Sequence, residues 1–178
     1  MANRVALSEE TQPLYTADQR KRRDETPWTL VQGILAPLQF LVFLVSLALV
    51  LRYLATGEGA AVATASVVIK TLVLYAIMIT GSIWEKAVFD QYLFVPAFFW
   101  EDMVSMLVLA LHTAYLACVF FGWLTLTEQM YLAIAAYAAY VVNAVQFVWK
   151  FRIARLGEAN VGAALRKSSR MAPEGAMQ

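Results

Sequence analysis

The stretch WTLVQGILAPLQFLVFLVSLALVL, residues 28–51, carries no charged side chain. A helix needs about 20 consecutive apolar residues to cross a bilayer core, whereas the apolar part of a secretory signal is only about 7–15 residues long. This stretch therefore predicts a membrane-spanning helix that is not cleaved. Of the 178 residues in the chain, 61% are hydrophobic and only 15% are charged. A soluble domain is about 45–50% apolar and about a quarter charged, so the composition also indicates a membrane protein.

Three further apolar segments follow in the chain. They span residues 60–84, with Lys70 near the middle, residues 103–124 around His112, and residues 129–149, which are rich in alanine and tyrosine. Only helices or closed barrels satisfy backbone hydrogen bonds in lipid, and these segments are far longer than membrane strands of about ten residues. We therefore expect an all-α integral membrane protein, a bundle of four transmembrane helices.

Basic residues are distributed unevenly about these four segments. Twelve of the 14 Lys and Arg residues, all but Arg52 and Lys70, lie before the first segment, between the second and third, or after the fourth. Such residues are in excess on the cytoplasmic side of membranes, so the pattern predicts that both termini are cytoplasmic. The chain then divides into a polar cytoplasmic segment at 1–27, a four-helix domain at 28–155 and a polar cytoplasmic tail at 156–178. We expect this tail to be mobile.

The composition excludes several functional classes. A net charge of +1, with basic residues that flank apolar runs, gives no support for nucleic-acid binding. A single cysteine, Cys118, excludes a disulfide framework and a CxxC redox pair, and a single histidine, His112, excludes bis-histidine haem and a His/Cys zinc site. The chain also lacks a phosphate-binding loop. We expect no metal site and no cofactor.

The connection between the second and third segments, residues 84–102, combines seven aromatic residues with four carboxylic acids. One interpretation is an aromatic belt at the membrane interface with solvated acids between the rings. The other is a cavity for a flat aromatic ligand, in which rings such as Trp84, Tyr92 and Trp100 stack while the acids supply protons. Composition does not separate these two interpretations.

The third segment carries a polar stripe. Glu101, Ser105, His112 and Tyr115 follow at spacings of 4, 7 and 3, which place them on one helix face. Glu101 and His112 lie about 16 Å apart along the axis, so only a large ligand could contact both. The structural alternatives are a neutral His112 bonded to a neighbouring helix and a Ser105 hydroxyl bonded to its own helix. In the fourth segment, Asn143 and Gln146 are expected to form interhelical hydrogen bonds.

Lys70 presents a similar choice, because an unpaired ammonium near the middle of a span is costly. We expect this lysine to snorkel to the interface, in a span that begins near Val67 and continues past Trp84 to include Glu85. The alternative is a lysine that faces the bundle interior and pairs with a carboxylate of the protein or of a substrate. A small transporter with Lys70 as its charged site is disfavoured, because the chain has no inverted repeat.

Several short motifs resemble a known family. They are PWTLVQG at 27–33, WEK at 84–86, QYLF at 91–94, FFWED at 98–102 and HTAY at 112–115. Together they are similar to the 3-vinyl (2-vinyl) bacteriochlorophyllide hydratase family of bacteriochlorophyll biosynthesis, over residues 14–155. The resemblance implies an enzyme, a hydro-lyase. It would convert the 3-vinyl group of a chlorophyllide or bacteriochlorophyllide to a 1-hydroxyethyl group without a redox cofactor.

This implied chemistry suggests roles for the residues. Hydration of a vinyl group needs a proton for the terminal carbon, a stabilised cation and a directed water, which carboxyl groups can provide. Glu101 and Asp102 are adjacent at the membrane surface, where desolvation and like charge favour keeping one of them protonated, and Glu85 is the reserve candidate. His112 is expected to ligate the magnesium of the substrate. The other expected substrate-binding residues are Tyr115, Trp100, Trp84, Tyr92, Ser105 and Lys70.

The resemblance also implies a setting. We expect a multi-pass protein of the bacterial inner, intracytoplasmic photosynthetic membrane that contacts lipid, the chlorin substrate, water and other enzymes of the pathway. The alternative function is a non-catalytic chlorophyll-binding or assembly protein of a photosynthetic membrane. Binding alone would tolerate Glu101→Gln, whereas acid catalysis would not.

Overall fold

A computed structural model describes the backbone of residues 14–171 and the side chains of residues 14–157. The prediction of an all-helical chain is confirmed over this range. Four of the helices, with α5 taken as far as Gly157, are long and apolar enough to cross a membrane. The helices are α1 (Ala17–Glu25), α2 (Pro27–Thr56), α3 (Ala60–Phe89), α4 (Phe99–Phe121) and α5 (Leu126–Met171).

Glycines form the turns that pair these helices. Gly57 ends α2 with a φ of 74°, and Gly122 ends α4 with a φ of 67°. Residues with a Cβ rarely adopt this left-handed conformation, which explains glycine at both positions. The short turns that follow make α2 and α3 one antiparallel hairpin and α4 and α5 a second one. The helices pack more extensively within each hairpin than between the two hairpins.

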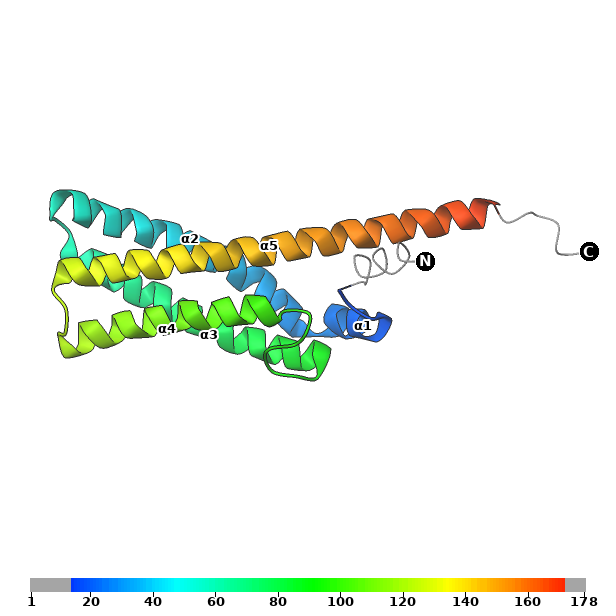
Figure 1. Ribbon diagram of the computed structural model, residues 1–178, viewed down its shortest axis with the longest axis horizontal. Coiled ribbons are helices and arrows are strands. Elements are labelled where there is room, and N and C mark those ends of the chain that lie inside the picture. The colour runs from blue at the N-terminus through cyan, green and yellow to red at the C-terminus, as the bar shows by residue number, and fades with distance from the viewer. Residues whose placement is uncertain (1–13, 172–178) are drawn as a thin grey trace, which may run out of the picture.

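The four long helices run side by side (Figure 1). One end of the bundle carries α1, the α3–α4 connection and the part of α5 that extends beyond the other long helices. We call this end the basic end. The two glycine turns lie at the opposite end. The described basic residues of this end are Arg20, Lys21, Arg22, Arg23, Lys86, Lys150, Arg152 and Arg155.

The bundle exposes apolar side chains and buries polar ones. Large hydrophobic residues such as Leu30, Ile34 and Val45 are more than half exposed. In contrast, the Ser46 hydroxyl is buried between two other helices, 2.5 Å from the Tyr137 hydroxyl of α5 and 2.7 Å from the Ser66 hydroxyl of α3. Lipid offers no hydrogen-bond partners, so polar groups in spanning helices must find them inside the protein.

The position of Lys70 differs from the expectation. Its side chain is fully buried, and its ammonium lies over the Tyr140 ring, 4.0 Å from the ring centroid. Because α3 begins at Ala60 and not near Val67, Lys70 is ten residues inside the helix, about 15 Å from its start. A lysine side chain is too short to cover that distance, so the prediction that Lys70 snorkels is wrong.

Two helices extend beyond the apolar segments. Helix α3 continues past Trp84 to Phe89 and includes Glu85, as expected, although it begins at Ala60 and not near Val67. Helix α5 continues to Met171, although we expected a mobile tail from residue 156. Residues 150–171 are rich in Arg, Ala, Leu and Lys, which are strong helix formers, and contain no proline that would stop the helix.

Candidate functional site at the α3–α4 connection

Three buried carboxylic acids lie at the basic end, where α3 ends and α4 begins. Glu85 is contributed by the last turns of α3, and Glu101 and Asp102 by the first turn of α4. Their exposed fractions are 6%, 7% and 3%, so all three are withdrawn from solvent. The two neighbours on α4 have different partners, because successive residues project about 100° apart around a helix.

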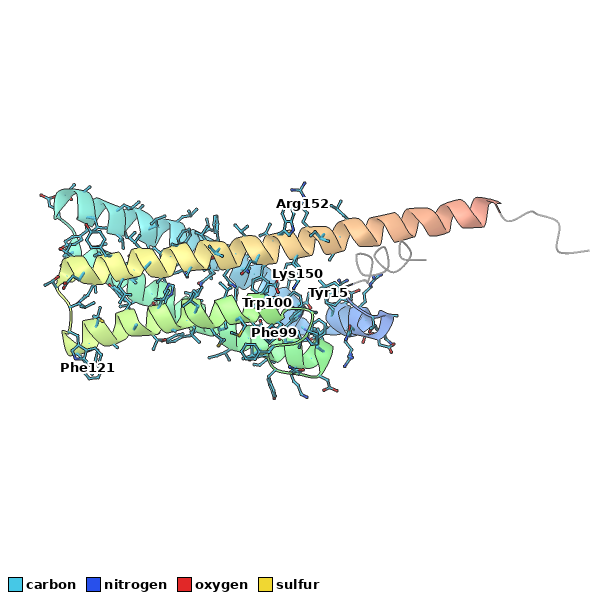
Figure 2. All side chains as sticks on the ribbon, in the orientation of Figure 1. Tyr15, Phe99, Trp100, Phe121, Lys150 and Arg152 are labelled. Atoms are coloured by element: carbon cyan, nitrogen blue, oxygen red, sulfur yellow. The ribbon has the colours of Figure 1, made fainter. Side chains whose placement is uncertain are left out.

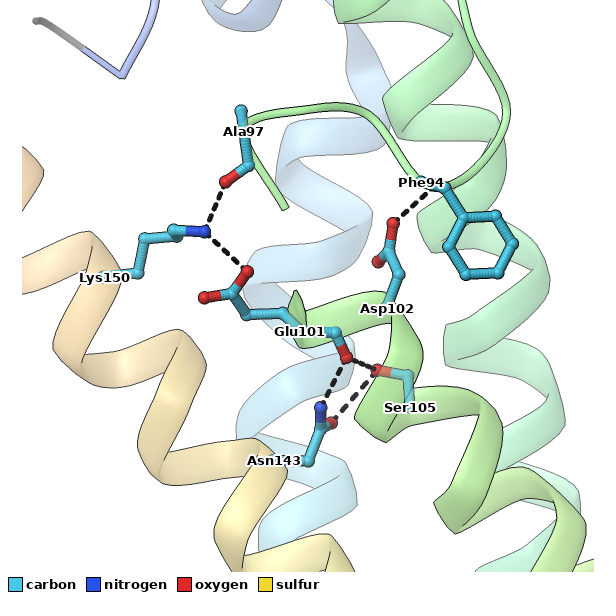
Figure 3. Close-up of polar contacts among 7 residues, drawn as sticks. All are labelled: Phe94, Ala97, Glu101, Asp102, Ser105, Asn143 and Lys150. Atoms are coloured by element: carbon cyan, nitrogen blue, oxygen red, sulfur yellow. Dashed lines mark hydrogen bonds and ion pairs between the residues drawn. The ribbon is translucent and has the colours of Figure 1, made fainter. Parts of the chain in front are cut away.

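Asp102 points toward α3 and the connection. Its Oδ2 accepts a hydrogen bond of 2.7 Å from the backbone N–H of Phe94 (Figure 3). Phe94 has a φ of 58°, an uncommon conformation for a residue with a side chain. The carboxyl of Glu85 lies beside that of Asp102 and interacts electrostatically with it. The connection is thus folded around the Glu85–Asp102 pair.

A contact between two carboxyl groups has a chemical consequence. Two neighbouring ionised carboxylates repel each other, and a proton on one of them removes this repulsion and allows a hydrogen bond between the two. Among the described residues, no N–H or O–H donor reaches the buried Oε2 of Glu85. The Glu85–Asp102 pair is therefore suited to hold one proton in a buried position, as paired carboxyls of acid–base sites do.

Glu101 points in the other direction, toward α5. Its Oε2 lies 2.5 Å from the ammonium of Lys150, which also donates to the carbonyl of Ala97 (Figure 3). The backbone carbonyl of Glu101 accepts a bond of 2.9 Å from the side-chain amide of Asn143, and the Ser105 hydroxyl lies 2.8 Å from the same carbonyl. This charge-assisted contact ties the first turn of α4 to α5. The interhelical bond expected of Asn143 is confirmed.

The aromatic residues of the connection divide into two groups. The indole N–H of Trp84 donates to the Thr29 hydroxyl at 2.9 Å, and its ring packs edge-to-face on Phe98 with centroids 5.9 Å apart. Trp84 is thus held between Thr29 of α2 and Phe98, next to the start of α4. Trp100 and Tyr92 are 70% and 59% exposed, as residues of an interfacial belt would be. Figure 2 shows Trp100 and Lys150 at this part of the bundle.

The deeper residues of the polar stripe, His112 and Tyr115, are fully buried. The Nδ1 of His112 lies 2.8 Å from the carbonyl of Val108, one turn back in the same helix, and not from a group on a neighbouring helix. A carbonyl only accepts, so Nδ1 carries the proton and Nε2 presents a lone pair. No partner for Nε2 exists within residues 14–157. Gln146, the other residue expected to form an interhelical hydrogen bond, also has no hydrogen-bond partner for its Oε1 in that range.

Two polar residues of the bundle are not evident from the sequence. The sequence indicates Lys150 only as part of the charge pattern, and no motif points to Gln39, a buried residue of α2. The signal for Lys150 is its spacing of seven from Asn143, which places both on one face of α5. Gln39 is one of the few polar residues in a long apolar segment, which is itself a signal for a position inside the bundle.

Comparison with known proteins shows that this chain is similar to one family. A family model described as 2-vinyl bacteriochlorophyllide hydratase matches residues 15–153. A 2-vinyl bacteriochlorophyllide hydratase from Cereibacter sphaeroides is 68% identical over 143 residues, which cover 80% of this chain and 89% of the relative. Another from Rhodobacter capsulatus is 64% identical over 150 residues, 84% of this chain and 87% of the relative. No solved structure matches the chain.

The Glu101–Lys150 contact predicts a stability effect. Lys150→Met should lower the free energy of unfolding in detergent by about 2 kcal/mol, because it leaves the buried Glu101 carboxylate without its cation. The double variant Glu101→Gln/Lys150→Met should recover most of this loss. The control is Lys86→Met, which removes an exposed ion pair with Asp90 and should cost about 0.5 kcal/mol or less. If both lysine variants lose the same free energy of unfolding, the loss in Lys150→Met does not arise from the burial of the Glu101 carboxylate.

Proposed function

This chain belongs to the 2-vinyl bacteriochlorophyllide hydratase family, and we propose that it hydrates the vinyl group of its substrate at the buried carboxyl pair Glu85–Asp102. It is a hydro-lyase of bacteriochlorophyll biosynthesis. The observation that supports the assignment of the site is that these two buried carboxyl groups lie side by side, an arrangement that favours a proton on one of them. Among the described residues, no feature favours the non-catalytic pigment-binding alternative over a hydratase.

The reaction proceeds by transfer of that proton. The pair delivers it to the terminal carbon of the vinyl group, which becomes a methyl group, and a cation forms on the carbon next to the macrocycle. The remaining carboxylate charge stabilises the cation and orients a water toward it. The water oxygen bonds to that carbon, and the proton that the water loses returns to the pair. The net change is the addition of one water, and no electrons are transferred.

Glu101 has a different role in this proposal, because its carboxylate is already neutralised by Lys150. Lys150 links Glu101 to the carbonyl of Ala97 and so fixes the connection against α5. We therefore propose the Glu85–Asp102 pair as the proton donor and Glu101 as the group that holds the start of α4 in place. Trp84 forms an apolar wall beside the pair, where it excludes water from the reacting carbon.

The substrate contributes its own metal ion. We propose that the free Nε2 of His112 ligates the magnesium of the chlorin, since its Nδ1 proton is held by Val108 and its lone pair is unused. Ser105 and Tyr115 extend the same face of α4 on either side. Because a proton and a water are sufficient for the reaction, we propose that the enzyme uses no cofactor.

The site also implies a location. We propose that the protein lies in the inner, intracytoplasmic photosynthetic membrane with its basic end in the cytoplasm, in accord with the excess of Lys and Arg at that end. Lipid then contacts the exposed apolar faces. Water and substrate reach the carboxyl pair from the cytoplasmic side, where other enzymes of the pathway supply the substrate and consume the product.

The carboxyl pair predicts a pattern of activity for the protein purified in detergent with no added nucleotide, flavin or metal. Asp102→Asn and Glu85→Gln should each lower turnover of a 3-vinyl chlorophyllide by about 10²-fold or more, the usual contribution of a general acid. Glu101→Gln should have a smaller effect. Turnover is followed by the blue shift of the red absorption band and by a product mass gain of about 18 Da, that of one water, as the proton and hydroxyl add.

A matched control is Asp90→Asn, in the same connection. Asp90 is exposed, and the hydrogen bond and charge of Lys86 hold the pKa of its carboxyl below the usual value, so it stays ionised and cannot donate a proton. This variant should retain wild-type turnover. Full activity of both Asp102→Asn and Glu85→Gln would place the proton donor elsewhere.

The role of His112 predicts a difference in binding. His112→Ala should weaken the affinity for a magnesium chlorophyllide about tenfold, a loss of about 1.4 kcal/mol, because the axial ligand is removed. Affinity for the corresponding metal-free chlorin should change little, which makes it the control ligand. If the variant keeps full affinity for the magnesium chlorin but loses turnover, His112 acts in the reaction and not as a ligand.

The orientation can be measured with reporter fusions. Alkaline phosphatase is active only outside the cytoplasm, so a fusion after Arg155 should be inactive and a fusion after Leu124, in the α4–α5 turn, should be active. The asymmetry of basic residues is the physical reason for this expectation. An active fusion after Arg155 would reverse the orientation of the site.

A further inference from the structure

Three polar side chains from three different helices are buried inside the bundle without hydrogen-bond partners. They are Gln39 of α2, Lys70 of α3 and His112 of α4, with exposed fractions of 2%, 0% and 0%. The atoms without a partner among the described residues are Gln39 Oε1 and Nε2, Lys70 Nζ and His112 Nε2. Buried polar groups are almost always hydrogen-bonded, so an unsatisfied group at three positions calls for an explanation.

The contacts of α5 place these groups near one another. The Lys70 ammonium and the Phe43 ring both pack on Tyr140, with ring centroids of Phe43 and Tyr140 5.0 Å apart. Gln39 is one turn from Phe43 on the same face of α2. The ring of His112 lies 5.8 Å from that of Tyr137, one turn from Tyr140, and Lys70 interacts electrostatically with His112. The three groups therefore surround one region at the interface of the two hairpins.

Nothing within the described chain compensates the charge of Lys70. Its ammonium forms no hydrogen bond or ion pair there and lies over the face of Tyr140. Glu85 on the same helix is fifteen residues away, about 22 Å along the axis, and lies beside Asp102. An ammonium in the interior of a membrane protein is costly and is retained where it binds an anion or another charged group.

The available atoms match one kind of ligand group. Lys70 offers an ammonium and Gln39 offers an amide N–H₂, and two such donors bind the two oxygens of a carboxylate in charge-assisted hydrogen bonds. Water alone would satisfy the hydrogen bonds but not the charge. A carboxylate would satisfy both, which identifies the ligand as an acidic group that is absent from the bundle itself.

We propose that Lys70 and Gln39 form a subsite for the free propionate carboxylate of the chlorophyllide, so that the enzyme selects the acid over its esters. This inference rests on the proposed function. The propionate and the vinyl group are on neighbouring pyrrole rings of the macrocycle, so a bound propionate carboxylate fixes which edge of the macrocycle can face the carboxyl pair. His112 is ten residues deeper on α4 than Asp102, about 15 Å along the axis. It borders the same region as Lys70, where it can reach the magnesium of the bound ligand.

The test compares a 3-vinyl chlorophyllide with its propionate methyl ester on the full-length protein in detergent. For the wild type, kcat/KM for the acid should exceed that for the ester at least about tenfold, mainly through KM, which is a binding difference of about 1.4 kcal/mol. In Lys70→Met the ratio should fall to near one, with turnover of the ester retained. Gln39→Leu should lower the ratio partially. Lys86→Met, an exposed lysine on the same helix, is the control and should leave the ratio unchanged.

Binding provides a second measurement that does not depend on turnover. The affinities of the acid and the ester are obtained from quenching of the tryptophan fluorescence and should differ as KM does, in the wild type but not in Lys70→Met. Removal of an uncompensated buried charge should not destabilise the free protein, so the unfolding temperature of Lys70→Met should equal or exceed that of the wild type. If the variant nevertheless fails to fold, the affinities of the wild type for the acid and the ester alone test whether the carboxylate subsite exists.

The outcomes separate this inference from the proposed function. Equal affinity of the wild type for acid and ester would overturn the subsite, as would an equal loss for both ligands in Lys70→Met. A wild type that binds the acid preferentially but hydrates neither compound would contradict the proposed function and leave the subsite supported.

Discussion

The absence of hydrogen-bond partners in lipid is the constraint on which the structure depends. Polar side chains of the four long helices are therefore favoured where another group of the protein can bond to them, whereas apolar side chains can face outward. Ser46, Ser66 and Tyr137 show this arrangement, since their hydroxyls join three helices at one level. The same constraint brings the acids of α3 and α4 together at the basic end, because neither can be left facing lipid.

The contrast between Glu101 and Asp102 connects this constraint to the chemistry. Both are buried, but their neighbours differ: Glu101 pairs with a cation, whereas Asp102 lies beside a second carboxyl, that of Glu85. A carboxylate that is neutralised by lysine serves to hold helices together, whereas a carboxyl that holds a proton can give it away. The partner on the neighbouring helix, and not the residue type, therefore decides which acid is suited to protonate a carbon.

The interior also has polar groups that these pairings do not use. Lys70, Gln39 and His112 retain free donors and acceptors at the interface of the hairpins, which is the less extensive of the packing interfaces. A bundle optimised only for stability would fill these positions with apolar side chains, since replacing an unpaired buried charge is neutral or stabilising. Their presence fits a protein whose interior accommodates a large, partly polar ligand, with its acidic chemistry at one end.

The sequence by itself determined the number of spans, the glycine turns and the acids available, because helix length, hydropathy and the left-handed conformation of Gly57 and Gly122 are local properties. It also identified the family, through motifs such as FFWED. It did not determine which charged groups meet: Glu101 and Asp102 are adjacent in the chain, yet Asp102 lies beside Glu85, seventeen residues away, and Glu101 pairs with Lys150. Nor did it place Lys70 inside the bundle or carry α5 to Met171. These features depend on where each helix begins, how it is rotated and which residue of an antiparallel neighbour lies at the same level, and only tertiary packing fixes those quantities.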